Sequence, residues 1–266
     1  MAQPVTTQPV LGQGRFADYS SISGQTFGFA AEGMTPPGCP PGLEYLAQLD
    51  ELQLNQKIDI LEILTNTALE VPNRYSLENS IGQRAYFAQE ESDCLNRICC
   101  GPNRGFIIHI TNNEGIEVMR CEREFKCCAG CCWCADGRCG WEMSVEAPVG
   151  NLIGYIRQHS SKWKCHLTLY DADRQKLYDI WSKCCPIFCI CCIDDINFYV
   201  FDAKSKNKLS PRIYKKWAGC VRECCTRADL LVCEFPGMDV KEKALFVCAA
   251  FMLDVMVFEP QKKKNN

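Results

Sequence analysis

The chain has 266 residues, a formal net charge of −3 at pH 7 and 47% hydrophobic residues. This length allows one large β domain or two small domains with a full hydrophobic core, and the acidic balance argues against a dedicated nucleic-acid binder, which usually has a basic domain. Residues 1–42 show no basic segment followed by an apolar one, so we expect no secretory signal peptide and synthesis in the cytosol. Disulfides are rare there, so the 22 cysteines are expected to be thiols, lipid attachment points or metal ligands.

The N-terminal segment, residues 1–42, is rich in Gly, Pro, Ser and Gln and is predicted to be disordered. Pro37 to Pro40 has the minimal PxxP spacing of an SH3 ligand, but no basic residue flanks it, so a linker is the competing interpretation. Protein partners are expected to bind through this segment. Three leucines with helical spacing then predict a short helix over residues 43–50.

Most of the chain after this helix has the two-residue periodicity and the turn residues of short β-strands. Two hairpins are the clearest, because Asn79 to Gly82 and Asn112 to Gly115 are turn sequences between strand-like segments. About a dozen strands are predicted, over residues 57–64, 74–77, 84–87, 106–110, 116–119, 140–146, 152–158, 165–170, 176–181, 196–202, 209–215 and 230–235. Turns rather than helices separate them, which indicates an antiparallel barrel or sandwich and not alternating βαβ units.

The last element, residues 241–258, is predicted to be a helix that is apolar on every side. Such a helix must be buried in protein or in lipid. Spanning a bilayer takes roughly 20 apolar residues, whereas this run has about 15, and Asp254 within it would cost about 2.5–3.5 kcal/mol at membrane depth. We therefore favour burial inside a closed β-barrel over a membrane span. The residues expected to pack in the barrel or in lipid are Ala244, Leu245, Phe246, Val247, Phe251, Met252 and Leu253.

Six segments of the chain are uncommon enough to identify a family. They are Pro40 to Leu46, Asn79 to Arg84, Cys99 to Pro102, the cysteine cluster from Cys127, Lys215 to Trp217 and Phe251 to Glu259. Together they resemble the phospholipid scramblase family. The resemblance implies a tubby-like fold, an all-β class in which a closed antiparallel β-barrel of about twelve strands surrounds a hydrophobic C-terminal α-helix. We therefore expect residues 43–259 to form the barrel domain, followed by a basic tail over residues 260–266.

The same resemblance implies a function. Members of the family are associated with calcium-stimulated, ATP-independent, bidirectional movement of phospholipids between membrane leaflets. Palmitoylated cysteines, nuclear import and DNA binding are also attributed to the family, so each of these is an expectation to be placed on residues of this chain.

The densest candidate site is a cysteine cluster between two predicted strands, formed by Cys127, Cys128, Cys131, Cys132 and Cys134. Its CxxC spacings suit a tetrahedral zinc site, but adjacent cysteines point in opposite directions on an extended backbone, which suits one metal poorly. Packing as small hydrophobes is a second interpretation. We favour an exposed loop beside a membrane with S-acylated thiols, and the resemblance places palmitoylated cysteines here. Two or more acyl chains give stable attachment, where one is marginal.

A second cluster, from Cys184 to Cys192, is more apolar than the first. Its Cys189 and Cys192 have the spacing of half a metal site. We expect buried thiols here, with a metal site shared between the two clusters as the alternative.

The resemblance also implies a calcium loop before the last helix, which matches residues 227–239. An EF-hand-like loop needs oxygen ligands at regular positions and a glycine at its turn. Here Arg227 stands where the first acid is expected, and Val232 replaces the glycine. The remaining candidate calcium ligands are Asp229, Glu234 and Asp239. A strand with solvated acids is the competing interpretation, so we expect calcium binding to be weak or absent.

Pro211 to Trp217 matches the family's nuclear import segment. The basic residues of this segment are Arg212, Lys215 and Lys216. Three charges along a strand are ordinarily a solvated face, so import is one of two interpretations. The lysines of the tail, Lys262 to Lys264, are open to two interpretations as well, contact with anionic lipid or a solubilising chain end.

Enzyme chemistry finds little support, because no nucleophile motif lies near the three histidines and no glycine-rich phosphate loop is present in the sequence. The sequence therefore predicts a scramblase-like protein held by palmitoyl groups at the cytosolic face of the plasma membrane, and located in the nucleus when it is not acylated. Membrane phospholipids are its expected partners and calcium its candidate cofactor, while nucleic acid is the less favoured partner. The alternative is a membrane-tethered module that binds lipid, protein or DNA and transports nothing.

Overall fold

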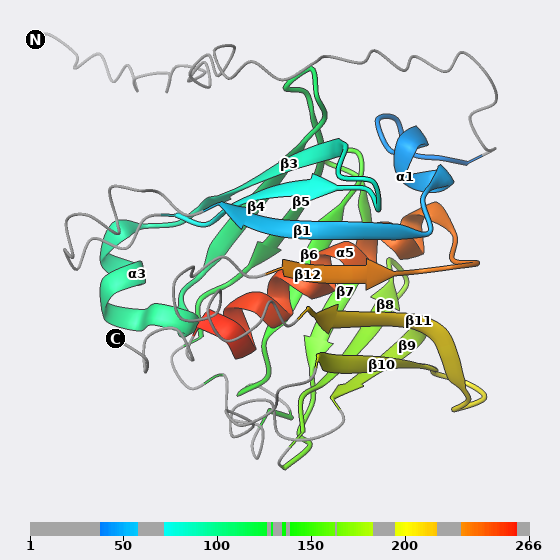
Figure 1. Ribbon diagram of the computed structural model, residues 1–266. Helices are drawn as coiled ribbons and strands as arrows, with labels where there is room; N and C mark the ends of the chain where they lie inside the picture. Colours follow the sequence, from blue (N-terminus) through cyan, green and yellow to red (C-terminus); the bar gives the residue numbers. More distant parts are fainter. Residues whose placement is uncertain are drawn as a thin grey trace, which may run out of the picture. The chain divides into compact units, whose positions relative to one another are not determined.

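The computed structural model describes residues 38–57, 72–126, 129, 135–136, 139–162, 164–182, 195–216 and 230–259. The chain divides into two units, Met1–Met34 and Thr35–Asn266, and every described residue belongs to the second unit. The described part of this unit contains a closed antiparallel barrel, a helix inside the barrel and two short α-helices outside it (Figure 1).

The barrel is formed by strands that pair with their neighbours in the sequence all the way round. The last strand pairs with the first and so closes the barrel, with Leu52 opposite Cys233. The strands are β1 Glu51–Lys57, β2 Arg74–Glu78, β3 Arg84–Glu91, β4 Phe106–Thr111, β5 Glu117–Arg123, β6 Glu142–Glu146, β7 Leu152–Gln158, β8 His166–Asp171, β9 Lys176–Ser182, β10 Ile196–Asp202, β11 Lys208–Lys215 and β12 Leu230–Glu234. Burial alternates along several of them, as in β4, where Phe106, Ile108 and Ile110 are buried. This is the two-residue period that the sequence shows.

The barrel is filled by helix α5 (Val240–Leu253) and the π-helical turn η3 (Asp254–Phe258) that continues it. Its first turn is fixed by a capping box, in which the side chains of Asp239 and Glu242 satisfy each other's backbone N–H groups. Close packing against the wall is possible at Gly154 of β7, because a Cβ there would lie 3.0 Å from Leu245 of the helix. The predicted barrel around a central helix is confirmed, and among the described residues no helix reaches the length and hydrophobicity that a bilayer span requires.

The largest differences from the sequence prediction lie before β2 and between β3 and β4. The helix expected over residues 43–50 is the shorter α1 (Glu44–Gln48), and the first strand follows it directly as β1. The strand predicted over residues 57–64 lies almost wholly outside the described residues. The sequence prediction also missed α3 (Cys94–Cys100) and the 3₁₀ turn η1 (Gly101–Asn103), which connect β3 to β4.

The connections between strands alternate between the two ends of the barrel, because every strand runs antiparallel to the one before it. At one end, the turn end, the connections between described strands are four or five residues long, for example residues 79–83 between β2 and β3. The opposite end carries the connections β1–β2, β3–β4, β5–β6, β7–β8, β9–β10 and β11–β12. Helix α5 starts near α1 and ends close to α3, so the chain leaves the barrel at this opposite end (Figure 1).

Candidate functional site

Cysteine residues distinguish the two ends of the barrel. Eighteen of the 22 cysteines belong to connections that leave and re-enter the barrel at the end opposite the turns, which we call the cysteine end. They are Cys94, Cys99, Cys100, Cys127, Cys128, Cys131, Cys132, Cys134, Cys139, Cys165, Cys184, Cys185, Cys189, Cys191, Cys192, Cys220, Cys224 and Cys225. The connections that contain the two predicted cysteine clusters therefore leave the barrel at the same end. The sequence alone did not reveal this.

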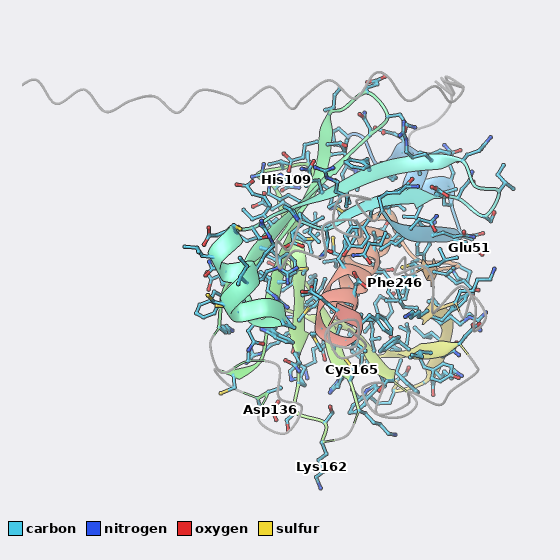
Figure 2. The ribbon with its side chains drawn as sticks, turned by 60° about the vertical axis from the view of Figure 1, so that its left-hand side comes forward. Glu51, His109, Asp136, Lys162, Cys165 and Phe246 are labelled. Carbon is cyan, nitrogen blue, oxygen red and sulfur yellow. The ribbon has the colours of Figure 1, made fainter. Side chains whose placement is uncertain are left out.

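Neighbouring connections at the cysteine end contact one another where the structure describes them. The backbone N–H of Ser160, in the β7–β8 connection, donates a 3.1 Å hydrogen bond to Asp136 in the β5–β6 connection. Figure 2 shows Asp136 and Lys162 from these two connections at the same edge of the molecule. Two neighbouring connections at the cysteine end are thus in contact.

The β3–β4 connection at this end contains α3, whose burial is the reverse of an ordinary surface helix. Asp93 caps its first turn by accepting a 3.3 Å hydrogen bond from the N–H of Asn96. The buried residue of α3 is Arg97. The exposed ones are Cys94, Leu95, Ile98 and Cys99. A surface helix normally buries its apolar stripe and exposes its charged residues.

Arg97 and Arg104 hold this connection in place. The Nη1 of Arg97 donates a 3.0 Å hydrogen bond to the hydroxyl of Ser92, just before the helix. Arg104, only 2% exposed, donates from Nε and Nη2 to the two carboxylate oxygens of Glu90 in β3, at 2.7 and 2.8 Å, and from Nη1 to Glu259 at 2.7 Å. The connection is therefore tied both to the barrel wall and to the end of the central helix.

The charges in this buried network support each other. Burial opposes the ionisation of Glu90, but the hydrogen bonds and the charge of Arg104 prevail and hold the pKa of that carboxyl below its usual value. Burial alone would also lower the pKa of Arg104, and its two carboxylate partners raise it instead. Both groups are therefore charged at neutral pH, which buried groups accept only when they are paired.

Arg123, at the end of β5, supports the same connection from the other side. Its guanidinium lies between two aromatic rings, 4.4 Å from the centre of Phe106 and 4.6 Å from that of Trp141, and its Nη2 donates to the carbonyls of Pro102 and Arg104 at 2.6 and 2.8 Å. Burial and the charge of Arg104 lower the pKa of Arg123 to about 9. Stacking on ring faces compensates part of the desolvation of such a cation.

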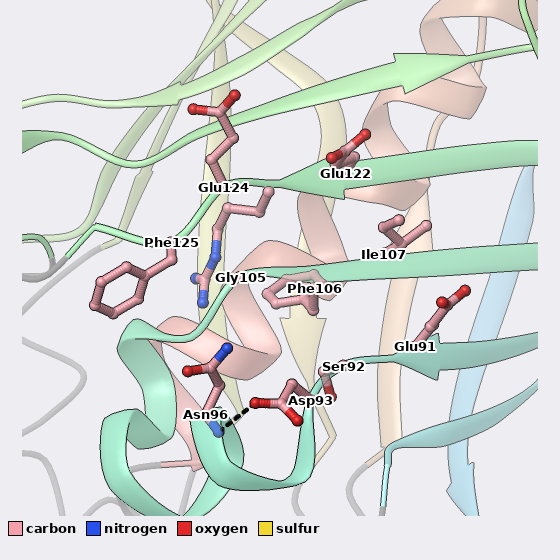
Figure 3. A pocket seen from close by; sticks show the side chains of 11 residues that line it. Glu91, Ser92, Asp93, Asn96, Gly105, Phe106, Ile107, Glu122, Glu124 and Phe125 are labelled. Carbon is pink, nitrogen blue, oxygen red and sulfur yellow. Dashed lines mark hydrogen bonds between the residues drawn. The ribbon is translucent and has the colours of Figure 1, made fainter. Parts of the chain in front are cut away.

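An open pocket of about 550 Å³ lies between α3 and the neighbouring strand ends (Figure 3). It is lined by Glu91, Ser92, Asp93, Asn96, Gly105, Phe106, Ile107, Glu122, Arg123, Glu124 and Phe125. Gly105 allows the two walls to approach closely, since a Cβ there would come within 2.9 Å of the backbone nitrogen of Phe125. The side chains at the rim are mainly carboxylates, with the exposed ring of Phe125 beside α3.

The five cysteines predicted to be acylated, Cys127, Cys128, Cys131, Cys132 and Cys134, lie outside the described residues. The chain enters this segment from Phe125 and Lys126, which follow directly after β5 and Glu124. The seven residues expected in a membrane or core helix, in contrast, are all at most 1% exposed within the barrel.

The candidate calcium ligands are occupied by other interactions where they are described. Glu234 ends β12 and accepts two hydrogen bonds from Arg212, at 2.7 and 2.9 Å, while Asp239 caps α5. Asp229 lies outside the described residues, among which no group of three or more side chains is placed to hold a metal ion. Residues 230–234 form a strand, so the match to a calcium loop falls partly on the barrel wall. Calcium binding stays a prediction.

The candidate import residues lie at the end of β11. Arg212 is paired with Glu234, and the Nζ of Lys215 lies 5.0 Å from the centre of the Phe258 ring. Lys216 continues the pairing of the strands through its backbone, by donating to the carbonyl of Leu230. An import receptor that binds these three side chains would have to displace at least the ion pair between Arg212 and Glu234. Nuclear import therefore also stays a prediction.

Comparison with known proteins identifies the family. A family model described as Scramblase matches residues 30–260, which include the whole barrel. The chain is 40% identical to phospholipid scramblase 1 of Homo sapiens over 225 residues, covering 84% of this chain and 68% of the human protein. It is 39% identical to phospholipid scramblase 2 of Bos taurus over 227 residues, covering 85% and 74%, and 33% identical to phospholipid scramblase 4 of Homo sapiens over 239 residues, covering 87% and 69%.

The chain spans about two thirds of the length of the mammalian phospholipid scramblase 1 proteins that it matches, for example 64% of that of Rattus norvegicus. No solved structure matches the chain significantly. The family model matches most of the chain, and the relatives are 33–40% identical over more than four fifths of it; on that basis the chain belongs to the scramblase family.

Proposed function

We propose that this protein moves phospholipids between the leaflets of a membrane, in both directions and without ATP. The observation that carries the proposal is the match of residues 30–260 to the scramblase family model. The relatives of the chain are named phospholipid scramblases. The absence of a recognisable phosphate loop from the sequence agrees with transport that consumes no nucleotide. Chemistry on the lipid is not part of the proposal, so the protein would act as a transporter and not as an enzyme.

Attachment is proposed to occur at the cysteine end. Palmitoyl groups on Cys127, Cys128, Cys131, Cys132 and Cys134 would hold this end against the cytosolic face of the plasma membrane. The position of the β5–β6 connection at the cysteine end supports this orientation, because several acyl chains on this connection would enter the same bilayer. Without acylation the protein would be free to reach the nucleus.

Helix α5 is an unsuitable route for headgroups. Its residues from Ala244 to Leu253 are enclosed by the strands and at most 1% exposed. We therefore assign contact with lipid to the outer surface of the cysteine end, where the described side chains include exposed apolar residues and carboxylates.

The test is reconstitution of the purified full chain into liposomes that carry a fluorescent phospholipid in both leaflets. A membrane-impermeant reductant bleaches only the outer leaflet in empty liposomes. If the protein transports lipid, nearly all of the label becomes accessible in every liposome that contains protein. Heat-unfolded protein reconstituted in the same way is the control for leakage, and bleaching confined to the outer leaflet would contradict the proposal.

Calcium dependence is tested in the same assay. Stimulation is expected from the family resemblance, whereas the pairing of Glu234 with Arg212 favours weak binding by residues 227–239. If transport is the same in the presence of a calcium chelator and of millimolar calcium, calcium is not part of the function. If calcium stimulates transport, the Asp229→Ala variant shows whether the predicted loop is responsible.

A second candidate function is a membrane-tethered module that binds lipid or protein and transports nothing. The enclosure of α5 favours it, because a helix whose residues from Ala244 to Leu253 are at most 1% exposed offers no polar path to headgroups. In the liposome assay this function predicts binding of the protein to the vesicles without any change in the accessible fraction of label.

A further inference from the structure

We propose that the outward face of α3, together with Phe125, inserts into the interfacial region of a phospholipid bilayer and orients the cysteine end against it. This α3 surface consists of Cys94, Leu95, Ile98, Cys99 and Phe125. The inference deepens the proposed function by naming the residues that contact the membrane, and it rests on that function for its biological meaning.

Three of the five exposed large hydrophobic side chains in the described part of the chain belong to this surface. Leu95 is 69% exposed, Ile98 47% and Phe125 49%. Leu95 and Ile98 are three residues apart on the helix and therefore project from the same side. Phe125 lies near the start of the same helix, because it lines the same pocket as Asp93 and Asn96 of the β3–β4 connection (Figure 3).

These exposed side chains lie on a connection that several arginine side chains hold against the barrel. Arg97 is the buried residue of α3 and donates a hydrogen bond to Ser92. The helix therefore turns its charged side toward the barrel and its apolar Leu95 and Ile98 toward the outside. The connection is then fixed by Arg104 to Glu90 and Glu259. Burying an arginine while exposing a leucine and an isoleucine opposes the hydrophobic effect in water, so the arrangement suits a second apolar phase outside the protein.

A bilayer fits this surface better than a protein partner. A stable protein interface uses roughly 20–30 residues and about 800 Å² on each side, whereas the apolar area here comes from five side chains. For insertion into lipid no such minimum applies, because each buried apolar group adds its own contribution. The surface also continues into the proposed attachment segment, since Phe125 is only two residues from Cys127.

Charge at the rim selects the kind of bilayer. Asp93, Glu122 and Glu124 are exposed around the pocket, and they would be repelled by anionic headgroups and attracted by the ammonium groups of zwitterionic ones. Glu91 lies on the same rim and is bonded to His109 at 2.8 Å. We therefore assign this surface to membranes rich in zwitterionic phospholipid.

The experiment is flotation of the full, unacylated chain with phosphatidylcholine vesicles. In one variant Leu95→Gln and Ile98→Gln are combined. The matched control combines Ile81→Gln and Ile116→Gln, because these isoleucines are 74% and 57% exposed in turns at the opposite end of the barrel. We expect the first pair to lower partitioning into vesicles about tenfold and the second pair to leave it unchanged, with the same thermal midpoint for all three proteins.

Equal losses in the two variants, or no binding by the unaltered chain, would overturn the proposal. A change of oligomeric state in the Leu95 and Ile98 variant, with vesicle binding unchanged, would overturn it in favour of a second copy of the chain. As an independent readout, tryptophan introduced by Leu95→Trp should be quenched by brominated phosphatidylcholine, and that introduced by Ile81→Trp should not.

A third variant tests the rim. Glu122→Gln combined with Glu124→Gln should raise binding to vesicles that contain phosphatidylserine while leaving binding to pure phosphatidylcholine unchanged, and no gain on the anionic vesicles would contradict the assignment of lipid class. All of these measurements report binding by unacylated protein. If the protein binds vesicles through α3 but does not transport labelled lipid, this inference holds while the proposed function fails.

Discussion

The hydroxyl of Tyr75 in β2 donates a 2.6 Å hydrogen bond to the carboxylate of Asp254, 179 residues later in the central helix. The Tyr75 ring also packs against Phe251, with 5.0 Å between the ring centres. Asp254 is the residue that argues against a membrane span in the sequence, and the barrel wall supplies the donor that a bilayer lacks. Burial and this carboxylate both raise the pKa of Tyr75, so the tyrosine remains a donor at any ordinary pH.

The first prediction is that Tyr75→Phe destabilises the barrel. Removing one partner of a buried hydrogen bond costs about 1–3 kcal/mol, and the substitution removes this donor while leaving the ring in place. The free energy of unfolding from urea denaturation measures the loss. Tyr199→Phe is the control, because the ring of Tyr199 lies at the barrel surface beneath Lys208; a cost as large as that of Tyr75→Phe would contradict the special role of the Asp254 bond.

The second prediction concerns the filling of the barrel by α5. Ala249 and Ala250 are fully buried, so Ala250→Trp should overpack the core and cost about 1–3 kcal/mol or more. The same residue placed by Ile81→Trp in an exposed turn should be close to neutral. Deleting residues 244–258 removes the core that the strands surround. A cooperative unfolding transition that survives this deletion in detergent-free buffer would refute the buried-helix structure.

Two strong sequence patterns made part of the fold predictable. Alternation along segments such as Phe106 to Ile110, and the absence of polar side chains from Ala244 to Leu253, together require strands around a buried helix. The sequence prediction missed β1, although Leu52 and Leu54 alternate with polar residues in it. The helical spacing of the preceding leucines competed with that shorter signal.

The candidate site was much less predictable. The buried side chain of α3 is Arg97, so a search for an apolar face could not find this helix, and its remaining signals were the capping residue Asp93 and the glycine that ends it. The network that anchors it joins residues 14 and 155 positions apart, Arg104 to Glu90 and Arg104 to Glu259. Nothing in a single sequence indicates such pairs, and the gathering of cysteines at one end required the strand order.

The third prediction is that Arg104→Met is strongly destabilising. It leaves Glu90 buried without its cation, and removing one partner of a buried pair typically costs about 3–5 kcal/mol. The control is Arg212→Met, which breaks the more exposed pair with Glu234 and should cost no more than about 1 kcal/mol. Both are measured by urea denaturation at neutral pH, and similar costs for the two variants would show that the buried network contributes no more than a surface pair.

The fourth prediction is a pH dependence that arises from Glu90. The pKa of this carboxyl is lower in the folded protein than the ordinary 4.5, so below about pH 4.5 the unfolded chain binds the proton more readily than the folded protein does. Stability from Glu90 is therefore present above that pH and falls as the pH decreases toward the folded pKa. Unfolding free energies of the unaltered chain and of Glu90→Gln, compared between about pH 6 and pH 3.5, should show a steeper decline in the unaltered chain. Parallel curves would be inconsistent with the role given to Arg104.

The fifth prediction is that Cys127, Cys128, Cys131, Cys132 and Cys134 attach the protein to the membrane. Replacing all five with alanine should transfer the protein from the membrane fraction to soluble or nuclear fractions and abolish acylation that hydroxylamine releases. The physical reason is the number of chains, because one acyl group gives only marginal attachment and two or more give stable attachment.

The chain provides a control with the same number of cysteines in the β9–β10 connection. These are Cys184, Cys185, Cys189, Cys191 and Cys192. If they are buried thiols, as the sequence indicates, replacing them with alanine should leave acylation intact, and any loss of stability would appear in the unfolding transition. Unchanged membrane fractionation of the first variant would refute the prediction, whereas equal loss from both variants would mean that attachment is shared across the cysteine end. Single restorations of Cys127 and Cys134 in the first variant should each recover only weak membrane binding, and their combination should recover most of it, because stable attachment needs a second acyl chain.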